Sequence, residues 1–270
     1  MKIAEKSKLK FYLQILFCTI YFSANCIQAV ESIKDKAVLE EIKLNRNHPE
    51  ILAELLPIVK CPFAPTQYEK ILMTELRDKQ TSMKKFREIS KKITSLLVFK
   101  VIETLPVVPH EIETPLIKYD GITFAGSIDF VSVMRSGDAL LETFIEHFPE
   151  ASISKILVQR DETTAEPEFK YMKLSSSLNE NSRVVITEPM IATGGTLSIV
   201  IQLLKEKGVP EENITIASIC TAPEGLLVLN NKFPKINVVM TVMDDRLDER
   251  KYIVPGLGDF GDRFFGTNIR

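Results

Sequence analysis

The sequence predicts an α/β fold, a doubly wound and mostly parallel sheet with helices on both faces. Beyond Pro106, patterns typical of strands and of helices alternate along the chain. The strand patterns are short, nearly continuous apolar runs, as expected for strands that are buried on both faces. Within 183–208, a strand pattern passes into a helix pattern through two glycines. N-terminal helices and a short β-hairpin arm complete the predicted fold.

Residues 1–29 have the order of a signal peptide. Four of the first ten residues are lysines, Phe11 to Phe22 is an apolar stretch of 12 residues, and Ser23 to Ala29 is more polar. A comfortable membrane span needs roughly 20 apolar residues. We therefore expect no stable membrane span in the mature chain. An uncleaved anchor and a mis-assigned start codon are the alternatives to a signal.

Helical patterns fill the region that follows. From Glu31 to Leu56, apolar residues recur at helical spacing. Prolines bound the stretch from Pro57 to Pro65, which is the expected linker. The predicted division of the chain is a signal-like or targeting segment at 1–29, a helical N-terminal extension at 30–65 and a main domain at 66–270.

The main domain opens with two amphipathic helices, expected at 66–78 and 81–103. After Pro106 we expect strands and helices in turn, together with a short hairpin arm around 169–174. The predicted strands are 112–117, 128–134, 153–159, 184–186, 214–219 and 236–242. The predicted helices between them are 139–148, 197–208 and 223–233.

Composition narrows the function class. With 270 residues, 45% hydrophobic and 26% charged, the chain suits one globular domain with extensions. A net charge of −2 provides no dominant basic field, which argues against a general nucleic-acid binder. The four cysteines form no Cys-x-x-Cys pair, and the three histidines lie far apart in sequence. We therefore expect neither a disulfide framework nor a structural zinc site.

The strand-to-helix crossover predicts an anion site. Two glycines there allow positive φ and close backbone approach, and Thr196 can cap the helix that follows. The free N–H groups at such a helix N-terminus bind anions. Glu188, at the end of the strand, places a carboxylate beside this cradle. An ordinary strand-turn-helix connection is the simpler interpretation of Thr-Gly-Gly-Thr alone, and neither a P-loop nor a Gly-x-Gly-x-x-Gly motif is present.

Two further segments follow predicted strands. The second candidate segment, Met134 to Gly137, places an arginine before a glycine turn, and the third, Val158 to Pro167, is densely charged without an apolar anchor, which predicts a mobile loop. Because ligands bind at the carboxyl ends of strands in open α/β sheets, we expect these two segments to share one rim with the crossover. Separately, Tyr252 to Thr267 has four glycines and a proline among aromatic residues and is expected to be an ordered loop over the sheet.

The string Glu-Pro-Met-Ile-Ala-Thr-Gly-Gly-Thr at 188–196 resembles the phosphoribosyl-diphosphate (PRPP) loop of type I phosphoribosyltransferases. The resemblance is specifically to the uracil phosphoribosyltransferase branch, where the loop usually begins with Asp. Met-Arg-Ser-Gly, Arg-Asp-Glu-Thr-Thr-Ala-Glu-Pro and Tyr-Ile-Val-Pro-Gly-Leu-Gly-Asp-Phe-Gly-Asp also resemble family strings, and their details are nearest to eukaryotic members. Leu76 to Ser82 resembles the N-terminal arm of the family, although its composition indicates only a solvated helix junction. The likeness covers roughly 71–270.

This resemblance implies roles for particular residues. Arg135, Arg160 and Asp259 would be the catalytic residues, and amide and carbonyl groups of the C-terminal segment would read the edge of a base. No protein side chain is expected to bind a metal directly. The implied PRPP-binding residues are Arg135, Arg160, Glu188, Pro189, Met190, Ile191, Ala192, Thr193, Gly194, Gly195, Thr196 and Asp259, and the implied uracil-binding residues are Ile253, Gly258, Asp259 and Phe260.

The implied reaction converts uracil and PRPP to UMP and pyrophosphate, with Mg²⁺ bound through PRPP. The family also implies a homodimer or homotetramer and, in some members, activation by GTP. A PRPP- or uracil-binding sensor without turnover is the alternative, because Glu188 replaces the usual Asp. PRPP is an intracellular metabolite, so a cytoplasmic enzyme and an organellar enzyme delivered through the signal-like N-terminus are both open.

Overall fold

A mostly parallel sheet forms the centre of the computed structural model, which describes residues 57–60, 65–160 and 167–267. These residues belong to one compact unit, Glu50–Arg270. Within them the strand order is β5-β4-β3-β6-β8, and both β7 and β9 pair with β8. Only the β4–β5 pair is antiparallel. The strands are β3 Ile128–Met134, β4 Ser152–Arg160, β5 Pro167–Lys173, β6 Arg183–Thr187, β7 Met190–Ile191, β8 Ile214–Thr221 and β9 Asn237–Met243.

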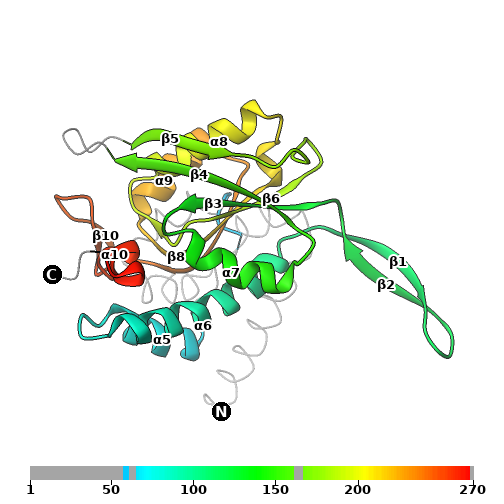
Figure 1. Ribbon diagram of the computed structural model, residues 1–270, viewed down its shortest axis with the longest axis horizontal. Coiled ribbons are helices and arrows are strands. Elements are labelled where there is room, and N and C mark those ends of the chain that lie inside the picture. The colour runs from blue at the N-terminus through cyan, green and yellow to red at the C-terminus, as the bar shows by residue number, and fades with distance from the viewer. Residues whose placement is uncertain (1–56, 61–64, 161–166, 268–270) are drawn as a thin grey trace, which may run out of the picture. The chain divides into compact units, whose positions relative to one another are not determined.

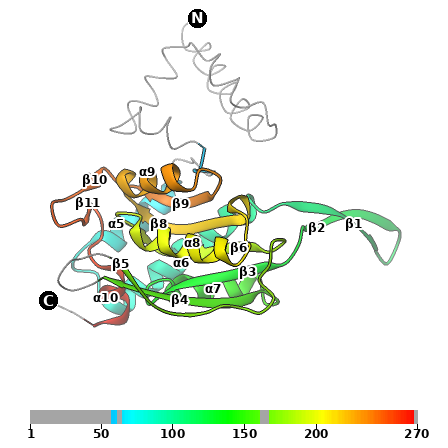
Figure 2. The same cartoon turned by 90° about the horizontal axis from the view of Figure 1, so that it is seen from above.

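Helices cover both faces of this sheet (Figures 1 and 2). Alternate residues of a strand point to opposite faces, so Phe130 packs with α5, α6 and α7 whereas its neighbour Val131 packs with α8 and α9. Strand β8 is buried along its whole length. The predicted doubly wound fold is therefore confirmed. The helices are α5 Gln67–Arg77, α6 Met83–Ile102, α7 Asp138–His147, α8 Gly195–Glu206 and α9 Pro223–Lys232, with a short 3₁₀ turn at Glu211–Asn213.

The first two helices lie where the sequence predicts them. Thr66 and Glu69 form a reciprocal capping box that begins α5, and the Ser82 hydroxyl caps α6. Leu76 and Phe86 from the two helices are fully buried. The junction between these two helices lies close to the C-terminal segment, which forms part of the candidate site described below.

A long β-hairpin, β1 Val107–Glu113 and β2 Lys118–Phe124, extends away from the central sheet (Figures 1 and 2). The strand predicted at 112–117 is therefore wrong, because 114–117 is the turn. The Thr114 hydroxyl accepts hydrogen bonds from the N–H groups of Leu116 and Ile117 and closes this turn. The hairpin arm expected around 169–174 is instead β5, the edge strand of the main sheet.

Part of the predicted linker is packed against the sheet. Val59 forms a parallel bridge with Val238 of β9, and Ile58 is fully buried. The Val238 N–H donates to the Ile58 carbonyl at 2.7 Å, and the Lys60 N–H donates to the Val238 carbonyl at 3.2 Å. The short segment thus covers an edge that would otherwise expose unpaired backbone groups.

Ile58→Ala is expected to lower the free energy of unfolding by about 2 to 5 kcal/mol, because it removes a fully buried side chain and leaves a cavity. Ile71→Ala is the matched control. That side chain is 56% exposed, so its loss should change stability by less than about 0.5 kcal/mol. Urea unfolding measures both, and equal effects would show that Ile58 does not anchor the extension.

The predicted signal-like segment, 1–29, and the helical pattern at 31–56 lie outside the described residues, as do Cys18, Cys26 and Cys61. Cys220 is buried and carries a free thiol. None of the helices in the described part of the chain combines the length and the apolar character needed to cross a membrane.

Candidate active site

The loop between β6 and α8 forms a cradle of backbone amides. Gly194 adopts the left-handed conformation, with φ +75°, and a Cβ there would lie 2.7 Å from the Gly225 carbonyl oxygen. Only glycine fits these constraints. Gly194 is also the N-cap of α8, which corrects the expected capping role of Thr196, a residue of the first helical turn. No side chain of the N-cap binds the first amides of α8, and the Gly195 N–H makes only a long hydrogen bond, 3.5 Å, to the Thr193 hydroxyl, so an anion can bind here.

Glu188 lies at the entrance of this loop. Its N–H donates to the Ala217 carbonyl at 3.2 Å, and its carboxyl group accepts a hydrogen bond from the Met190 N–H at 3.4 Å. Burial of the carboxyl group raises the pKa of Glu188 to about 8, and the negative charge of Asp259 adds to the rise against the opposing hydrogen bond. The residue nevertheless keeps part of its surface exposed. A hydrogen bond from a ribose hydroxyl, or a nearby cation, would favour the charged form of this carboxyl group.

The stability of the protein is expected to fall as pH rises because of Glu188. Its usual pKa is 4.5 and its folded pKa about 8, so between these values the unfolded chain has released a proton that the folded chain keeps. This stabilisation is fully present below the unfolded pKa and is lost as pH rises through the folded pKa, at up to about 1.4 kcal/mol per pH unit.

Glu188→Gln cannot ionise and should lose this part of the pH dependence. Urea unfolding of both proteins between about pH 5 and pH 9 measures the difference. Parallel stability curves would contradict the assignment of a protonated Glu188 to the folded protein.

The second predicted segment lies against the first. Arg135 follows β3 after a cis peptide bond to Met134, and α7 begins at Asp138. A Cβ on Gly137 would lie 2.2 Å from the Thr187 carbonyl oxygen, so this turn packs on the end of β6. The Arg135 side chain is 58% exposed, and its guanidinium lies 3.7 Å from the Asp262 carboxylate and donates a long hydrogen bond, 3.5 Å, to the Thr267 hydroxyl. Such long contacts at the surface can yield to a phosphate group, which the planar fork of arginine suits.

The third predicted segment starts at the end of β4, whose last residue is Arg160. The loop 161–166 lies outside the described residues, so the expected mobile loop is not tested. The chain returns at Pro167, whose Cγ is 3.0 Å from the position that a Cβ on Gly195 would take. Both ends of the loop therefore belong to strands beside the amide cradle.

The C-terminal segment closes the site and contains a short helix, α10 Phe260–Phe265, where the sequence predicts only a loop. It also contributes the short strand pair β10 Arg246–Leu247 and β11 Ile253–Val254. Asp259 is the N-cap of α10, where its carboxylate accepts from the Asp262 N–H at 2.8 Å. The Phe260 ring is buried against Phe86, with 5.2 Å between the ring centroids. Phe260 can therefore contact a base only through its backbone. This agrees with the prediction that backbone amide and carbonyl groups bind the base.

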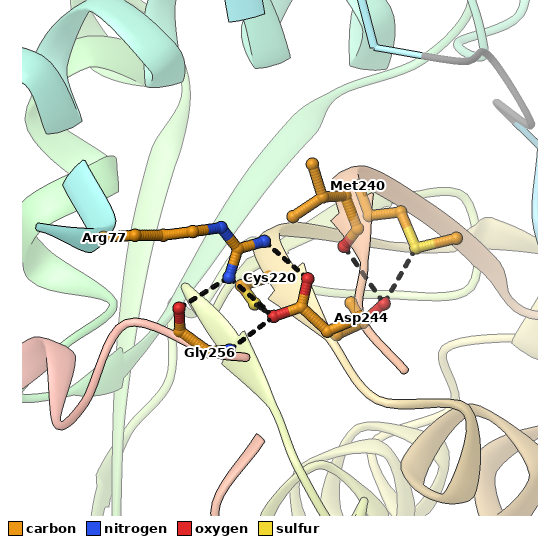
Figure 3. Close-up of polar contacts among 7 residues, drawn as sticks. Arg77, Cys220, Met240, Asp244 and Gly256 are labelled. Atoms are coloured by element: carbon orange, nitrogen blue, oxygen red, sulfur yellow. Dashed lines mark hydrogen bonds and ion pairs between the residues drawn. The ribbon is translucent and has the colours of Figure 1, made fainter. Parts of the chain in front are cut away.

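One contact of this segment was not predicted. Arg77, in the junction interpreted as solvated, reaches Asp244 and the Gly256 carbonyl (Figure 3). Its partners lie 167 and 179 positions further along the chain. The only available signal was the resemblance of Leu76 to Ser82 to a family segment.

The amide cradle, the arginine turn and the glycine-rich C-terminal segment meet at the carboxyl edge of a doubly wound sheet, and this combination defines the type I phosphoribosyltransferase class. The uracil phosphoribosyltransferase family model matches residues 64–267. The chain belongs to the uracil phosphoribosyltransferase family.

Individual relatives agree with this assignment. The chain is 41% identical over 202 residues to a uracil phosphoribosyltransferase of Dictyostelium discoideum, covering 73% of this chain and 92% of that protein. It is 37% identical to a uracil phosphoribosyltransferase of Limosilactobacillus fermentum, covering 72% of this chain and 92% of the relative. Among solved structures, the AQ2163 protein from Aquifex aeolicus is similar, with a TM-score of 0.68, 28% identity and coverage of 77% of this chain and 98% of that one.

Proposed function

We propose that this protein is a uracil phosphoribosyltransferase that converts uracil and PRPP to UMP and pyrophosphate. The observation that carries the proposal is the packing of the C-terminal segment on the arginine turn, where a Cβ on Gly261 would lie 3.0 Å from the Ser136 hydroxyl oxygen. A phosphoribosyl group held at the cradle would then lie beside a backbone-lined site for a base. Family membership supports the same pair of substrates.

In this proposal, the backbone of Thr193 to Thr196 holds the 5′-phosphate and Glu188 accepts hydrogen bonds from the ribose hydroxyls. Arg135 and Arg160 bind the pyrophosphate. The remaining loop residues, Pro189 to Ala192, carry the strand β7 that fixes the loop to β8. Each of these assignments follows from a position at the carboxyl edge of the sheet.

The reaction needs no protein nucleophile. Uracil N1 forms a bond to the anomeric carbon as the bond to the pyrophosphate oxygen breaks, and the N1 proton is released. Positive charge develops on the ribose and negative charge on the leaving pyrophosphate. Catalysis then comes from holding the two substrates in line and from stabilising the leaving group with arginine side chains.

The site residues also fit Mg²⁺ bound to the diphosphate. Mg²⁺ prefers oxygen ligands and keeps several of its waters, so it needs no dedicated cluster of protein side chains. Burial and the charge of Asp259 oppose ionisation of Glu188, and a nearby cation would favour its ionised form. When bound, Mg²⁺ would neutralise charge that develops on the leaving pyrophosphate.

We further propose that the protein forms a homodimer or homotetramer. The β1–β2 hairpin carries exposed apolar side chains, among them Leu116 at 90% and Ile122 at 71% exposure. Such a patch is typical of a surface that contacts another chain. Activation by GTP and the role of residues 1–29 as a signal remain predictions from the sequence.

The base site is expected to accept uracil and reject cytosine and purines. Cytosine reverses the donor and acceptor pattern of the uracil edge, and each buried polar group left unpaired costs about 1 to 3 kcal/mol. With radiolabelled PRPP and Mg²⁺ held constant, kcat/KM for cytosine should be at least about tenfold lower than for uracil. Comparable rates with the two bases would overturn the assignment of the base, whereas nucleotide formed only from hypoxanthine would place the protein with purine enzymes.

A further inference from the structure

A partly buried ion pair between α5 and the residue after β9 holds the C-terminal segment at Gly256 (Figure 3). Arg77 is the last residue of α5, and Asp244 directly follows β9. The Arg77 guanidinium donates to both oxygens of the Asp244 carboxylate, with 2.7 Å from Nη1 to Oδ2 and 2.5 Å from Nη2 to Oδ1. This two-point geometry fixes the orientation of both groups.

The same two side chains hold both polar groups of Gly256. Arg77 Nη1 donates to the Gly256 carbonyl at 2.5 Å, and the Gly256 N–H donates to Asp244 Oδ2 at 2.8 Å. Gly256 has φ +60°, and a Cβ there would lie 2.0 Å from the Ile253 carbonyl oxygen. Since this position cannot carry a side chain, the chain can be held here only through its backbone.

Asp244 is positioned for this role. Its side chain is 4% exposed, and it accepts a further hydrogen bond from the Cys220 thiol at 3.2 Å. Burial opposes the charge of Arg77, but the hydrogen bonds and negative charge of Asp244 raise the pKa of the guanidinium. Burial also raises the pKa of the Cys220 thiol, which therefore stays a donor. Both carboxylate oxygens of Asp244 are thus hydrogen-bonded.

A second contact ties the next residue to the same helix junction. Arg263 donates from Nη1 to the Leu257 carbonyl and from Nη2 to the Asp78 carbonyl, both at 2.7 Å. Its guanidinium also lies over the Phe86 ring, 4.4 Å from the centroid. Gly256 is therefore held directly by Arg77, and its neighbour Leu257 is linked to the α5–α6 junction through Arg263 of α10.

We propose that Arg77 and Asp244 are positioning residues for base recognition. By holding Gly256, they fix the positions of the nearby residues Ile253 and Gly258. The backbone groups of these two residues are the ones proposed to bind the base. The inference rests on the proposed function. It predicts a selective effect, because the amide cradle at 193–196 and Arg135 come from other elements and bind the other substrate.

Kinetics of the full chain test this inference. Arg77→Met should raise KM for uracil by about tenfold or more and leave KM for PRPP within about twofold. Arg77→Lys keeps the charge but loses the planar fork, so it should recover part of the uracil affinity. Asp244→Asn preserves the shape of the Asp244 side chain and should have the same kinetic effect as Arg77→Met. It provides a second variant if Arg77→Met folds poorly.

Lys100→Met is the matched control. Lys100 pairs with the buried Glu69 between the same two helices, so its loss should lower thermal stability without a selective change in KM for uracil. If the Arg77 and Asp244 variants change both KM values equally, or lose only stability as the control does, the positioning role is wrong.

A parent protein that forms no UMP would overturn the proposed function and this inference together, whereas an active parent with unaffected variants would overturn this inference alone.

Discussion

Arg135→Ala is expected to lower kcat/KM for PRPP by roughly a hundredfold to ten-thousandfold. The guanidinium can donate two hydrogen bonds to the leaving pyrophosphate, each worth about 1.5 to 3 kcal/mol, and each 1.4 kcal/mol is a factor of ten in rate. Thermal stability should hardly change, because the side chain is 58% exposed and its contact to Asp262 is 3.7 Å long. Steady-state kinetics with thermal unfolding measure both quantities.

Arg135→Lys separates charge from geometry at the same position. Lysine keeps the positive charge but cannot donate two parallel hydrogen bonds. The kcat/KM of Arg135→Lys for PRPP should therefore fall between those of the parent and of Arg135→Ala. An Arg135→Ala protein with the kinetics of the parent would remove this residue from the site.

Gly194→Ala should reduce activity by about a hundredfold or more, with loss of PRPP binding. The left-handed conformation costs a non-glycine residue about 1 to 2 kcal/mol, and the added Cβ would lie 2.7 Å from the Gly225 carbonyl oxygen. The loop must therefore move, and a displacement of about 1 Å at a site that holds reacting groups can cost a hundredfold in rate. PRPP affinity measured by calorimetry and the rate of UMP formation report the effect.

Gly208→Ala is the control for backbone strain. Gly208 also has positive φ, +90°, but a Cβ there meets nothing within 4 Å. It ends α8 at the opposite end from the amide cradle. This variant should lose about 1 kcal/mol of stability and keep its activity. Equal losses of activity in the two variants would show that strain, and not the geometry of the cradle, explains the result at Gly194.

The central fold could be predicted because its signal is local. Phe130 and Val131 stand in a short apolar run typical of a strand buried on both faces, and Leu197, Val200, Ile201 and Leu204 recur at helical spacing, so the local pattern identifies the elements. The β1–β2 hairpin gives no such signal, because the residues of β1 are exposed on both sides. Helix α10 spans six residues among glycines, too few for a helical period to be recognised.

The candidate site was predictable segment by segment, but the relations between its segments were not. Resemblance to a family identified Arg135, Glu188 and Asp259, whose mutual placement depends on the packing of separate elements. The raised pKa of Glu188 depends on burial and on Asp259, 71 positions away (259 − 188). Likewise, the composition around Arg77 indicated a solvated surface residue, whereas in the fold Arg77 is partly buried and paired with Asp244.

The most direct test of the proposed activity measures UMP and pyrophosphate together in one incubation of the full chain with uracil, PRPP and Mg²⁺. The proposed reaction predicts that the two products appear in equal amounts and continue to accumulate over many turnovers per protein molecule. Neither product should form at a comparable rate when uracil is omitted. A protein that binds uracil or PRPP but forms no UMP would contradict the enzyme assignment and identify the chain as a sensor.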